Sequence, residues 1–298
     1  MKKDNPYKSG FVTVIGRPNV GKSTLINTLV GQKIAAVSDK PNTTRNRILG
    51  IRTTVNAQII FLDTPGIHKA SGPLAKAMVQ TAMSAIREAD VVIIMIEVNE
   101  PFGKGDTFII NNLPNPAILV INKIDTIKKN EILRIIDSSR RFENKFTDII
   151  PVSALNSDGT QDLLDTIISY LPEGPKFFPD DMITDQPERF IASEFIREKI
   201  FSLTRQEIPY KTAVVIEKFE EVPEKKIINI SAVIYVERDN HKGIIIGKKG
   251  EMLKQIGTLA RADIERILGT KVFLELWVKV KDNWSHRENL IREFGYGE

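Results

Sequence analysis

The sequence contains no cysteine at all. A chain without thiols cannot form disulfides, bind zinc through thiolates or use a cysteine nucleophile. Histidine is scarce too: the three residues, His68, His241 and His286, have a spacing that fits no metal site. Thiol chemistry and the usual cysteine–histidine zinc sites are therefore excluded.

Long apolar runs are also missing. The longest uniformly apolar run covers residues 91–96, which is far shorter than the roughly 20 residues that cross a bilayer as a helix. The first residues, MKKDNP, have no apolar signal core behind them. Since secretory signals need such a core, we expect a soluble, cytoplasmic protein.

The composition that remains is ordinary for a globular protein, with 42% hydrophobic and 27% charged residues. At about 100–200 residues per domain, a length of 298 residues suggests two domains. The net charge of +4 lies in residues 1–180 (22 basic, 18 acidic), because residues 181–298 carry 20 of each. Residues 238–281 nevertheless hold 10 basic against 5 acidic residues. By itself, such a run is usually a solvated face.

The first half alternates apolar runs with helical patterns. Predicted strands cover residues 11–15, 58–62, 91–98, 117–121 and 148–152, with a more polar edge strand at 47–55. Predicted helices cover residues 21–29, 73–88, 105–113, 130–142 and 159–170. Continuous apolar strands between helices predict a doubly wound α/β domain with a mostly parallel sheet. Ligands of such sheets bind beyond the carboxyl ends of the strands.

A proline-rich stretch without periodicity, from residue 171 to Pro187, separates this half from the next. Beyond it we expect an α+β domain. Its predicted elements are a helix (187–204), two strands (212–219 and 226–237), a glycine-rich turn (241–250), a helix (251–268), a strand (271–280) and a last helix (284–294). The expected division is residues 1–172, a linker at 173–187, and residues 188–298.

The segment GRPNVGKS, Gly16 to Ser23, follows the first strand and opens a helix. That context is the one a phosphate-binding P-loop requires. Its glycines let backbone N–H groups turn toward phosphates, and the helix N-terminus adds a favourable dipole. Lys22 would bridge the β- and γ-phosphates, and the Ser23 hydroxyl would bind Mg²⁺.

Two further loops fit a sensor for the metal and the γ-phosphate. Asp63-Thr64-Pro65-Gly66 ends the predicted strand at 58–62, where an Asp can hold Mg²⁺ and a Gly N–H can approach the γ-phosphate. In Asn42-Thr43-Thr44-Arg45, one threonine hydroxyl would complete the Mg²⁺ shell. We favour Thr44 over Thr43, and a polar loop without metal contact remains the alternative.

A second pair of loops fits a guanine site. Asn122-Lys123-Ile124-Asp125 follows the strand at 117–121. A carboxylate at Asp125 can accept hydrogen bonds from guanine N1–H and its amino group, both absent from that edge of adenine. Sites built for such donors reject analogues strongly. Asn122 and Lys123 would brace the loop, and Ser153-Ala154-Leu155 would close it, with the Ala154 N–H on guanine O6.

These loops resemble those of the TrmE–Era–EngA branch of translation-factor-related GTPases over residues 10–170. The resemblance implies that nucleotide contacts come from Gly16, Arg17, Pro18, Asn19, Val20, Gly21, Lys22, Ser23, Thr24, Asp63, Thr64, Pro65, Gly66, Asn122, Lys123, Asp125, Ser153, Ala154 and Leu155. It implies Mg²⁺ ligands at Ser23, Thr44 and Asp63, and switch residues at Thr43, Thr44, Arg45, Gly66 and Ile67.

Ile67 occupies the position of the water-orienting glutamine of other GTPases, and relatives in this branch also lack that glutamine. We therefore expect slow intrinsic hydrolysis of GTP to GDP and phosphate, within a decade or two of about 10⁻⁴–10⁻² s⁻¹. In relatives an Asn matching Asn19 helps to hold K⁺. Whether Asn19 does so here stays open.

In the second half, Gly247-Lys248-Lys249-Gly250 forms a Gly-x-x-Gly turn. Such a turn lets a nucleic-acid backbone approach, and its two lysines meet the phosphates. Residues Ile244 to Ile246 would form one wall of a groove for unpaired bases. A lone Gly-x-x-Gly is more often a simple turn, but here the local basic excess and the flanking elements favour RNA. The element order α-β-β-α-α-β resembles a type II KH domain.

The two halves together resemble the Era GTPases over nearly the whole chain, with the turn and residues 272–280 as support. The resemblance implies binding of single-stranded RNA at the 3′ end of 16S ribosomal RNA during small-subunit assembly. The RNA-binding residues would be Lys242, Gly243, Ile244, Ile246, Gly247, Lys248, Lys249 and Gly250. It also implies a monomer and leaves open a peripheral association with the cytoplasmic membrane.

Three rival functions stay open on the residues alone. They are an RNA-binding module with a structural nucleotide, a membrane-associated signalling GTPase, and a P-loop kinase or ATPase, which Asp125 disfavours. We expect Trp277 in the core rather than on a stacking surface, and Trp284 is undecided. Lys254, Arg261 and Arg266 fit a solvated helix face.

Overall fold

The computed structural model describes residues 6–67, 72–142 and 144–296. The chain divides into two compact units. As far as the described residues go, unit 1 contains 6–35, 44–67 and 78–185, and unit 2 contains 36–43, 72–77 and 186–296. No helix in these ranges is long and apolar enough to cross a membrane.

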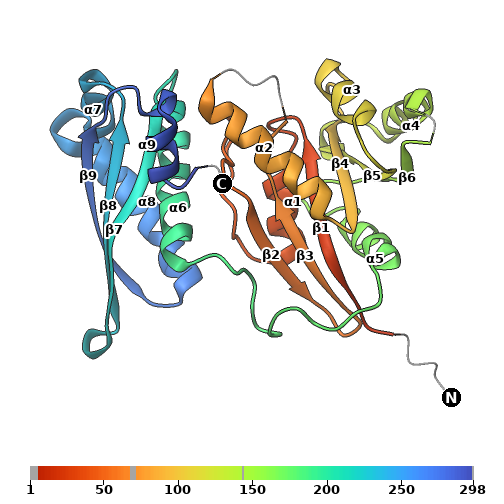
Figure 1. Ribbon diagram of the computed structural model, residues 1–298, viewed down its shortest axis with the longest axis horizontal. Helices are drawn as coiled ribbons and strands as arrows, with labels where there is room; N and C mark the ends of the chain where they lie inside the picture. Colours follow the sequence, from red (N-terminus) through yellow and green to blue (C-terminus); the bar gives the residue numbers. More distant parts are fainter. Residues whose placement is uncertain (1–5, 68–71, 143, 297–298) are drawn as a thin grey trace. The chain divides into compact units, whose positions relative to one another are not determined.

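A six-stranded sheet with the order β2-β3-β1-β4-β5-β6 forms the centre of unit 1 (Figure 1). The strands are β1 (Lys8–Gly16), β2 (Ile48–Thr53), β3 (Ala57–Asp63), β4 (Val91–Glu97), β5 (Ala117–Asn122) and β6 (Phe146–Pro151). Five strands are parallel, while the edge strand β2 runs antiparallel to β3. The predicted mostly parallel sheet and its polar edge strand are both confirmed.

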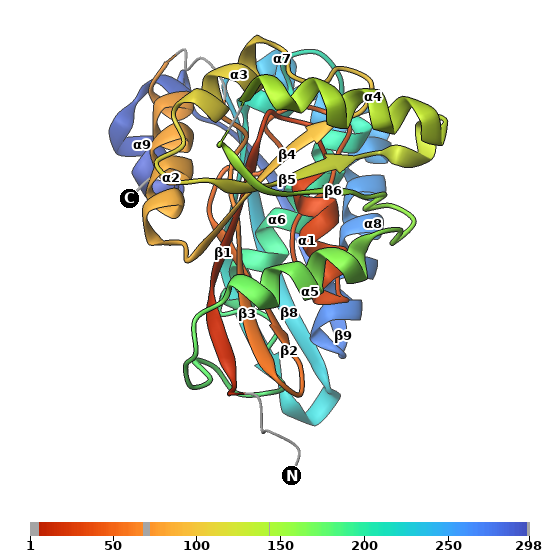
Figure 2. The ribbon, with the colours of Figure 1, turned by 90° about the vertical axis from the view of Figure 1, so that its right-hand side faces the viewer.

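Helices cover both faces of this sheet because its central strands are apolar on both sides. They are α1 (Lys22–Val30), α2 (Pro73–Glu88), α3 (Lys104–Asn111), α4 (Lys129–Ser139) and α5 (Thr160–Tyr170), with short 3₁₀ turns at Ile124–Thr126 and Arg140–Phe142. Ile86, Ile109 and Ile135 of α2, α3 and α4 share one core with strands β4 and β5. Helices α1 and α5 contact each other (Figure 2).

The segment expected as a linker, residues 173–187, forms several hydrogen bonds with unit 1. The buried side chain of Gln58 in β3 accepts hydrogen bonds from the Phe177 and Phe178 amides at 2.7 and 2.9 Å. The Ile51 amide in β2 donates to the Ile183 carbonyl at 2.8 Å. Unit 1 accordingly extends to residue 185. The segment is irregular, as its lack of periodicity predicted, but hydrogen bonds to β2 and β3 hold it against unit 1.

Unit 2 contains a three-stranded sheet with the order β7-β8-β9. Its elements are α6 (Glu188–Leu203), β7 (Thr212–Val222), β8 (Ile227–Val236), α7 (Asp239–Ile246), α8 (Glu251–Leu268), β9 (Lys271–Val280) and α9 (Glu288–Glu293). Short 3₁₀ turns lie at Pro209–Lys211, Pro223–Lys225, Lys248–Gly250 and Trp284–His286. Strands β7 and β8 are antiparallel, and β8 and β9 are parallel. The predicted order α-β-β-α-α-β is confirmed.

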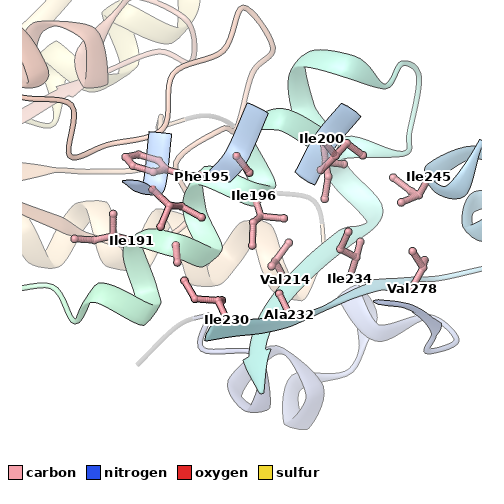
Figure 3. Close-up of a cluster of buried hydrophobic side chains, with 14 of the residues drawn as sticks. Ile191, Phe195, Ile196, Ile200, Val214, Ile230, Ala232, Ile234, Ile245 and Val278 are labelled. Carbon is pink, nitrogen blue, oxygen red and sulfur yellow. The ribbon is translucent and has the colours of Figure 1, made fainter. Parts of the chain in front are cut away.

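The core of unit 2 lies between this sheet and helices α6, α7 and α8 (Figure 3). Phe195 and Ile200 of α6 and Ile245 of α7 meet Ile234 of β8 and Val278 of β9. The residues of β7 and β8 that point to the other face pack against Trp284, Leu290 and Phe294 at the C-terminal end. One end of the sheet is therefore covered on both sides.

Three expectations for unit 2 are corrected. The turn expected at 241–250 is shorter, because residues up to Ile246 belong to α7, which is anchored by the fully buried Ile245. The last helix, α9, is also shorter and follows the buried Trp284, which settles the undecided case as core. Trp277, expected in the core, is 58% exposed. It pairs with Val233 on the sheet face opposite the core, whereas Val278 points inward.

Candidate functional site

The loop between β1 and α1 is shaped by contacts that exclude side chains. Gly21 has φ +99°, and a Cβ there would lie 2.4 Å from the Asn122 side-chain nitrogen. A Cβ at Gly66 would lie 2.7 Å from the Pro18 nitrogen. Only glycine therefore fits where this loop meets the loops that follow β3 and β5. The structure brings these motifs to one end of the sheet.

Lys22 begins α1 with its ammonium group inside the phosphate loop. Its Nζ donates to the carbonyls of Gly16 at 3.3 Å and Arg17 at 3.0 Å, and the residue is 6% exposed. Burial lowers the pKa of Lys22 from 10.5 to about 8, with nearby Asp63 opposing the change. A phosphate in this loop would supply the negative charge that favours the protonated lysine.

We expect this low pKa to couple nucleotide binding to proton uptake. Since GDP phosphates favour charged Lys22, the complex should bind more protons than the free protein, so affinity should fall as pH rises through about 8. Calorimetric titrations with GDP in buffers of different ionisation enthalpy should show uptake growing from about 0.1 proton at pH 7 to about 0.5 at pH 8. Constant uptake over this range would contradict the assignment.

Arg17, the second residue of the loop, is clamped to the start of α3. Its Nε donates to Asp106 Oδ1 at 2.8 Å, and its two terminal nitrogens donate to the side chain and carbonyl of Glu100 at 2.7 and 2.6 Å. A Cβ at Gly105 would lie 2.9 Å from Arg17 Cδ, so this glycine leaves room for the arginine. Burial raises the pKa of the Asp106 carboxyl, and the Arg17 guanidinium opposes that rise. The clamp was not predicted, because its acidic partners lie about 85 residues away in the sequence.

Three oxygen-bearing side chains converge beside the loop. Ser23 Oγ lies 2.7 Å from Asp63 Oδ2 and 2.9 Å from Thr44 Oγ1, and Thr44 Oγ1 lies 3.3 Å from Asp63 Oδ2. Thr43 Oγ1 instead donates to the Lys40 carbonyl at 2.8 Å. Hydroxyls and a carboxylate are the hard oxygen donors that Mg²⁺ prefers, so the set fits that ion. The preference for Thr44 over Thr43 agrees with this placement.

Ile67 faces the interior. It is 4% exposed, belongs to the core shared by α2, α3 and α4, and its amide donates to the Gly16 carbonyl at 3.2 Å. Thr64 is also buried, and its hydroxyl donates to the Val14 carbonyl. Among the described residues of this loop, no side chain is thus placed to orient a water molecule as a glutamine would.

The expected base loop is held together by Asn122. Its Nδ2 donates to the Val20 carbonyl at 2.8 Å and its Oδ1 accepts from the Ala154 amide at 3.0 Å. The Ala154 N–H, expected on guanine O6, is therefore engaged with Asn122 in this structure. Ser153 Oγ donates to Asp125 Oδ1 at 2.5 Å, and Lys123 forms an ion pair with Glu97. Asp125 and Leu155 lie exposed.

In unit 2 the Gly-x-x-Gly turn joins α7 to α8. Lys248 and Lys249 are exposed at its tip, and within the described chain neither forms an ion pair. Lys249 has φ +51° and Gly250 φ +82°, a left-handed backbone that turns the chain sharply. Lys242 is half-buried and Gly243 exposed on α7. Both turn lysines are thus placed where a polyanion can reach them.

A groove of about 370 Å³ lies between α8 and β9, next to this turn. Its lining combines apolar and basic side chains with small residues: Gly250, Leu253, Lys254, Gly257, Thr258, Arg261, Leu274 and Leu276. The lining does not include Ile244, which is 46% exposed, or Ile246, which packs partly against the core of unit 2. Lys254 and Arg261, taken as a solvated face, line the groove. Only their spacing on one helix, with Lys254 four residues after Gly250 and Arg261 seven residues after Lys254, could have indicated this.

Comparisons with known proteins agree with this arrangement. A family model described as a 50S ribosome-binding GTPase matches residues 11–123, and a KH domain model matches residues 207–285. The GTPase Era of Geobacter metallireducens is 52% identical over 296 residues, covering 98% of this chain and 99% of that protein. The GTPase Era of Leuconostoc citreum is 51% identical, covering 99% of this chain and 98% of that protein.

Two solved structures are similar over the whole length. One is Era in complex with MgGDPNP and nucleotides 1506–1542 of 16S ribosomal RNA, with a TM-score of 0.95 and 45% identity over 98% of this chain and 100% of that one. The other is a single-residue variant of Aquifex aeolicus Era bound to GDP·AlF₄⁻, with a TM-score of 0.94 and 44% identity at the same coverage. With both domains matched in order and across their full length, the chain belongs to the Era family of GTPases.

Proposed function

We propose that this GTPase binds the 3′ region of 16S ribosomal RNA through unit 2 and uses its nucleotide state to control that binding. The observation that carries the proposal is the groove between α8 and β9, with Lys254 and Arg261 in its wall and two exposed lysines at its end. Apolar groove floors suit unpaired bases, and flanking cations suit the phosphates. A relative of similar fold has been solved with nucleotides 1506–1542 of that RNA.

The nucleotide site would hold GTP or GDP in the roles predicted from its loops. Lys22 would contact the β- and γ-phosphates and Asp125 the guanine edge, while Gly16 to Thr24 would wrap the phosphates. Ser23, Thr44 and Asp63 would hold Mg²⁺, which, when bound, neutralises charge that develops on the phosphate oxygens. Thr43, Arg45, Gly66 and Ile67 would respond to the γ-phosphate. Slow turnover is consistent with the buried Ile67.

Asn19 is the residue that would help to hold a potassium ion. Its backbone within the phosphate loop is left-handed, with φ +66°. The carbonyl and side chain of Asn19 therefore point in directions different from those they would take in an extended backbone. A hydrolysis rate at least several-fold higher in KCl than in NaCl at equal ionic strength would support this role. Equal rates in the two salts would remove it.

The nucleotide-dependent switch is tested by measuring RNA affinity in two nucleotide states. A labelled RNA spanning nucleotides 1506–1542 should bind the full chain more tightly with a non-hydrolysable GTP analogue than with GDP, by about 5–150-fold if the coupling is of ordinary size. By linkage, the same RNA should raise the affinity for the analogue by the same factor. A matched RNA in which these nucleotides are paired in a duplex is the control.

Two outcomes decide between this proposal and a simpler binding module. If RNA affinity is equal in the two nucleotide states, the nucleotide does not control RNA binding. If the duplex binds as well as the single strand, the groove is not a reader of unpaired bases. The first result would contradict control of RNA binding by the nucleotide, and the second would contradict recognition of unpaired bases in the groove.

We also propose a role in small-subunit assembly, in the cytoplasm and as a monomer, with residues 1–172 as the nucleotide domain, 173–187 as the linker and 188–298 as the RNA domain. Support comes from the family and from the RNA of the solved relative. Peripheral membrane contact is the weaker alternative, because the short α9 carries mixed charges rather than a basic face. Sedimentation with anionic vesicles distinguishes the two.

A further inference from the structure

A second groove, of about 700 Å³, lies in unit 1 between α2 and α3. Val79, Met83 and Ile86 of α2 form one wall, Phe108 and Ile109 of α3 form the other, and Ile67 lies at its base. Phe108 is 62% exposed and Met83 37% exposed. Neither belongs to the nucleotide loops or to the RNA groove, so the function proposed above leaves this surface without a role.

The charges beside the groove are unbalanced. From Met78 to the end of α2 and throughout α3, the acidic residues are Glu88 and Asp106, and both are engaged, with Arg47 and Arg17 respectively. Of the two basic residues, Lys104 lines the groove and Arg87 directly follows the lining residue Ile86. Both are exposed and form no ion pair with any described residue. The uncommitted charge around this apolar surface is therefore positive. An occupant of complementary character is apolar on one side and acidic at its margins.

The dimensions suit a helix. The eight residues of α3 extend over about 12 Å at 1.5 Å per residue. Helices that dock into apolar grooves use anchors at i, i+3 or i+4, and i+7, which span a similar length of about 10.5 Å. RNA is a poorer fit, because the walls offer side chains of α2 and α3 that are mostly aliphatic, and only one aromatic ring.

The groove touches the nucleotide site at two points. Ile67, at its base, directly follows Gly66, which packs against Pro18 of the phosphate loop. Lys104 and Gly105, at the start of α3, directly precede Asp106, the residue that holds Arg17. A ligand that shifts either wall would therefore act on the loop that binds phosphates.

We propose that the groove between α2 and α3 binds an acidic amphipathic helix of a partner protein and thereby changes the rate of nucleotide turnover or release. The partner's apolar side chains pack against Met83 and Phe108, and its carboxylates pair with Arg87 and Lys104. Because a GTPase without a water-orienting side chain depends on how its phosphate loop is positioned, this contact is a natural point of control.

The test uses the full chain and a displayed library of 16-residue amphipathic helices in which the polar positions vary between acidic and basic residues. Selected peptides should be acidic and should bind Phe108→Asp at least tenfold more weakly than the unchanged protein. Leu133→Asp is the matched control, because Leu133 is 67% exposed on α4 and lies outside the groove. This variant should bind the selected peptides as tightly as the unchanged protein does. Both variants should keep unchanged GDP affinity.

Charge-reversal variants distinguish peptide binding in the groove from non-specific binding elsewhere on the protein. Lys104→Glu should weaken the selected acidic peptides about fivefold or more and favour basic ones, whereas Lys129→Glu, an exposed lysine on α4, should change neither. At saturation the peptides should alter GTP hydrolysis or GDP release at least threefold. The proposal is overturned if no enriched peptide distinguishes Phe108→Asp from Leu133→Asp, or if the bound peptides leave both rates unchanged. Loss of RNA binding in Phe108→Asp would show that RNA, and not a protein helix, occupies the groove.

Discussion

Replacing Asp125 by Asn should lower GTP affinity at least a hundredfold and raise the affinity for xanthosine triphosphate. The carboxylate accepts hydrogen bonds from two guanine donors, and bonds to a charged group contribute about 1.5–3 kcal/mol each. Two such bonds correspond to about 10²–10⁴ in affinity at 1.4 kcal/mol per tenfold. Xanthine carries a carbonyl in place of the amino group, so an Asn side chain can donate to it.

Competition with a fluorescent guanine nucleotide measures this change for both triphosphates. Asp162→Asn is a suitable control, because Asp162 is exposed on α5 and belongs to none of the predicted nucleotide loops. Retention of GTP affinity by the Asp125 variant would mean that the base is recognised elsewhere. The RNA affinity of unit 2 is not expected to change in the nucleotide-free protein, which separates this result from a general loss of folding.

Changing both Lys248 and Lys249 to Asp should reduce affinity for single-stranded RNA at least a hundredfold at low salt, with GDP affinity unchanged. Each lysine that neutralises a phosphate contributes about 0.7 to the slope of log affinity against log salt for single strands, so the slope should shrink by about 1.4. Lys249 has φ +51°, which Asp tolerates better than most residues. The loss should therefore come from charge rather than from backbone strain.

Lys225 and Lys226 provide the matched control. They are also adjacent exposed lysines in a turn of unit 2, between β7 and β8, and Lys226 likewise has a positive φ of 49°. Their replacement by Asp changes the net charge by the same amount. If this pair reduced RNA affinity as much as the first, the effect would reflect overall charge and the Gly-x-x-Gly turn would have no special role.

The elements of the fold could be predicted well where their residues carry one strong pattern. The uninterrupted apolar run at 117–121 became β5, an interior strand between β4 and β6, and the more polar run at 47–55 became the antiparallel edge strand β2. The buried face of strand β9 was harder to predict, because apolar residues occupy both faces of this strand. Period-two alternation puts Trp277 opposite Val278, and only the position of the helices decides which face is buried.

The contacts made by irregular segments could not be predicted from such patterns. A proline-rich stretch has the same composition whether it is free or fixed, and residues 173–185 are held by partners such as Gln58 that lie more than 100 residues earlier. The same limit applies to Arg17. Its place in the phosphate loop is evident from the motif, whereas its clamp to Glu100 and Asp106 depends on how α3 packs beside β1.

The sequence by itself determined the two-domain order and predicted the phosphate loop, the base loop and the Gly-x-x-Gly turn. These are local patterns whose chemistry depends on residues close together in the chain. Only the tertiary structure decided that Thr44 rather than Thr43 joins Ser23 and Asp63, that Lys254 and Arg261 line the groove between α8 and β9, and that an apolar groove opens between α2 and α3. Each of these features depends on which faces of separate helices, strands and loops come into contact. Tertiary packing decides those contacts, and the pattern of residues close together in the sequence does not contain them.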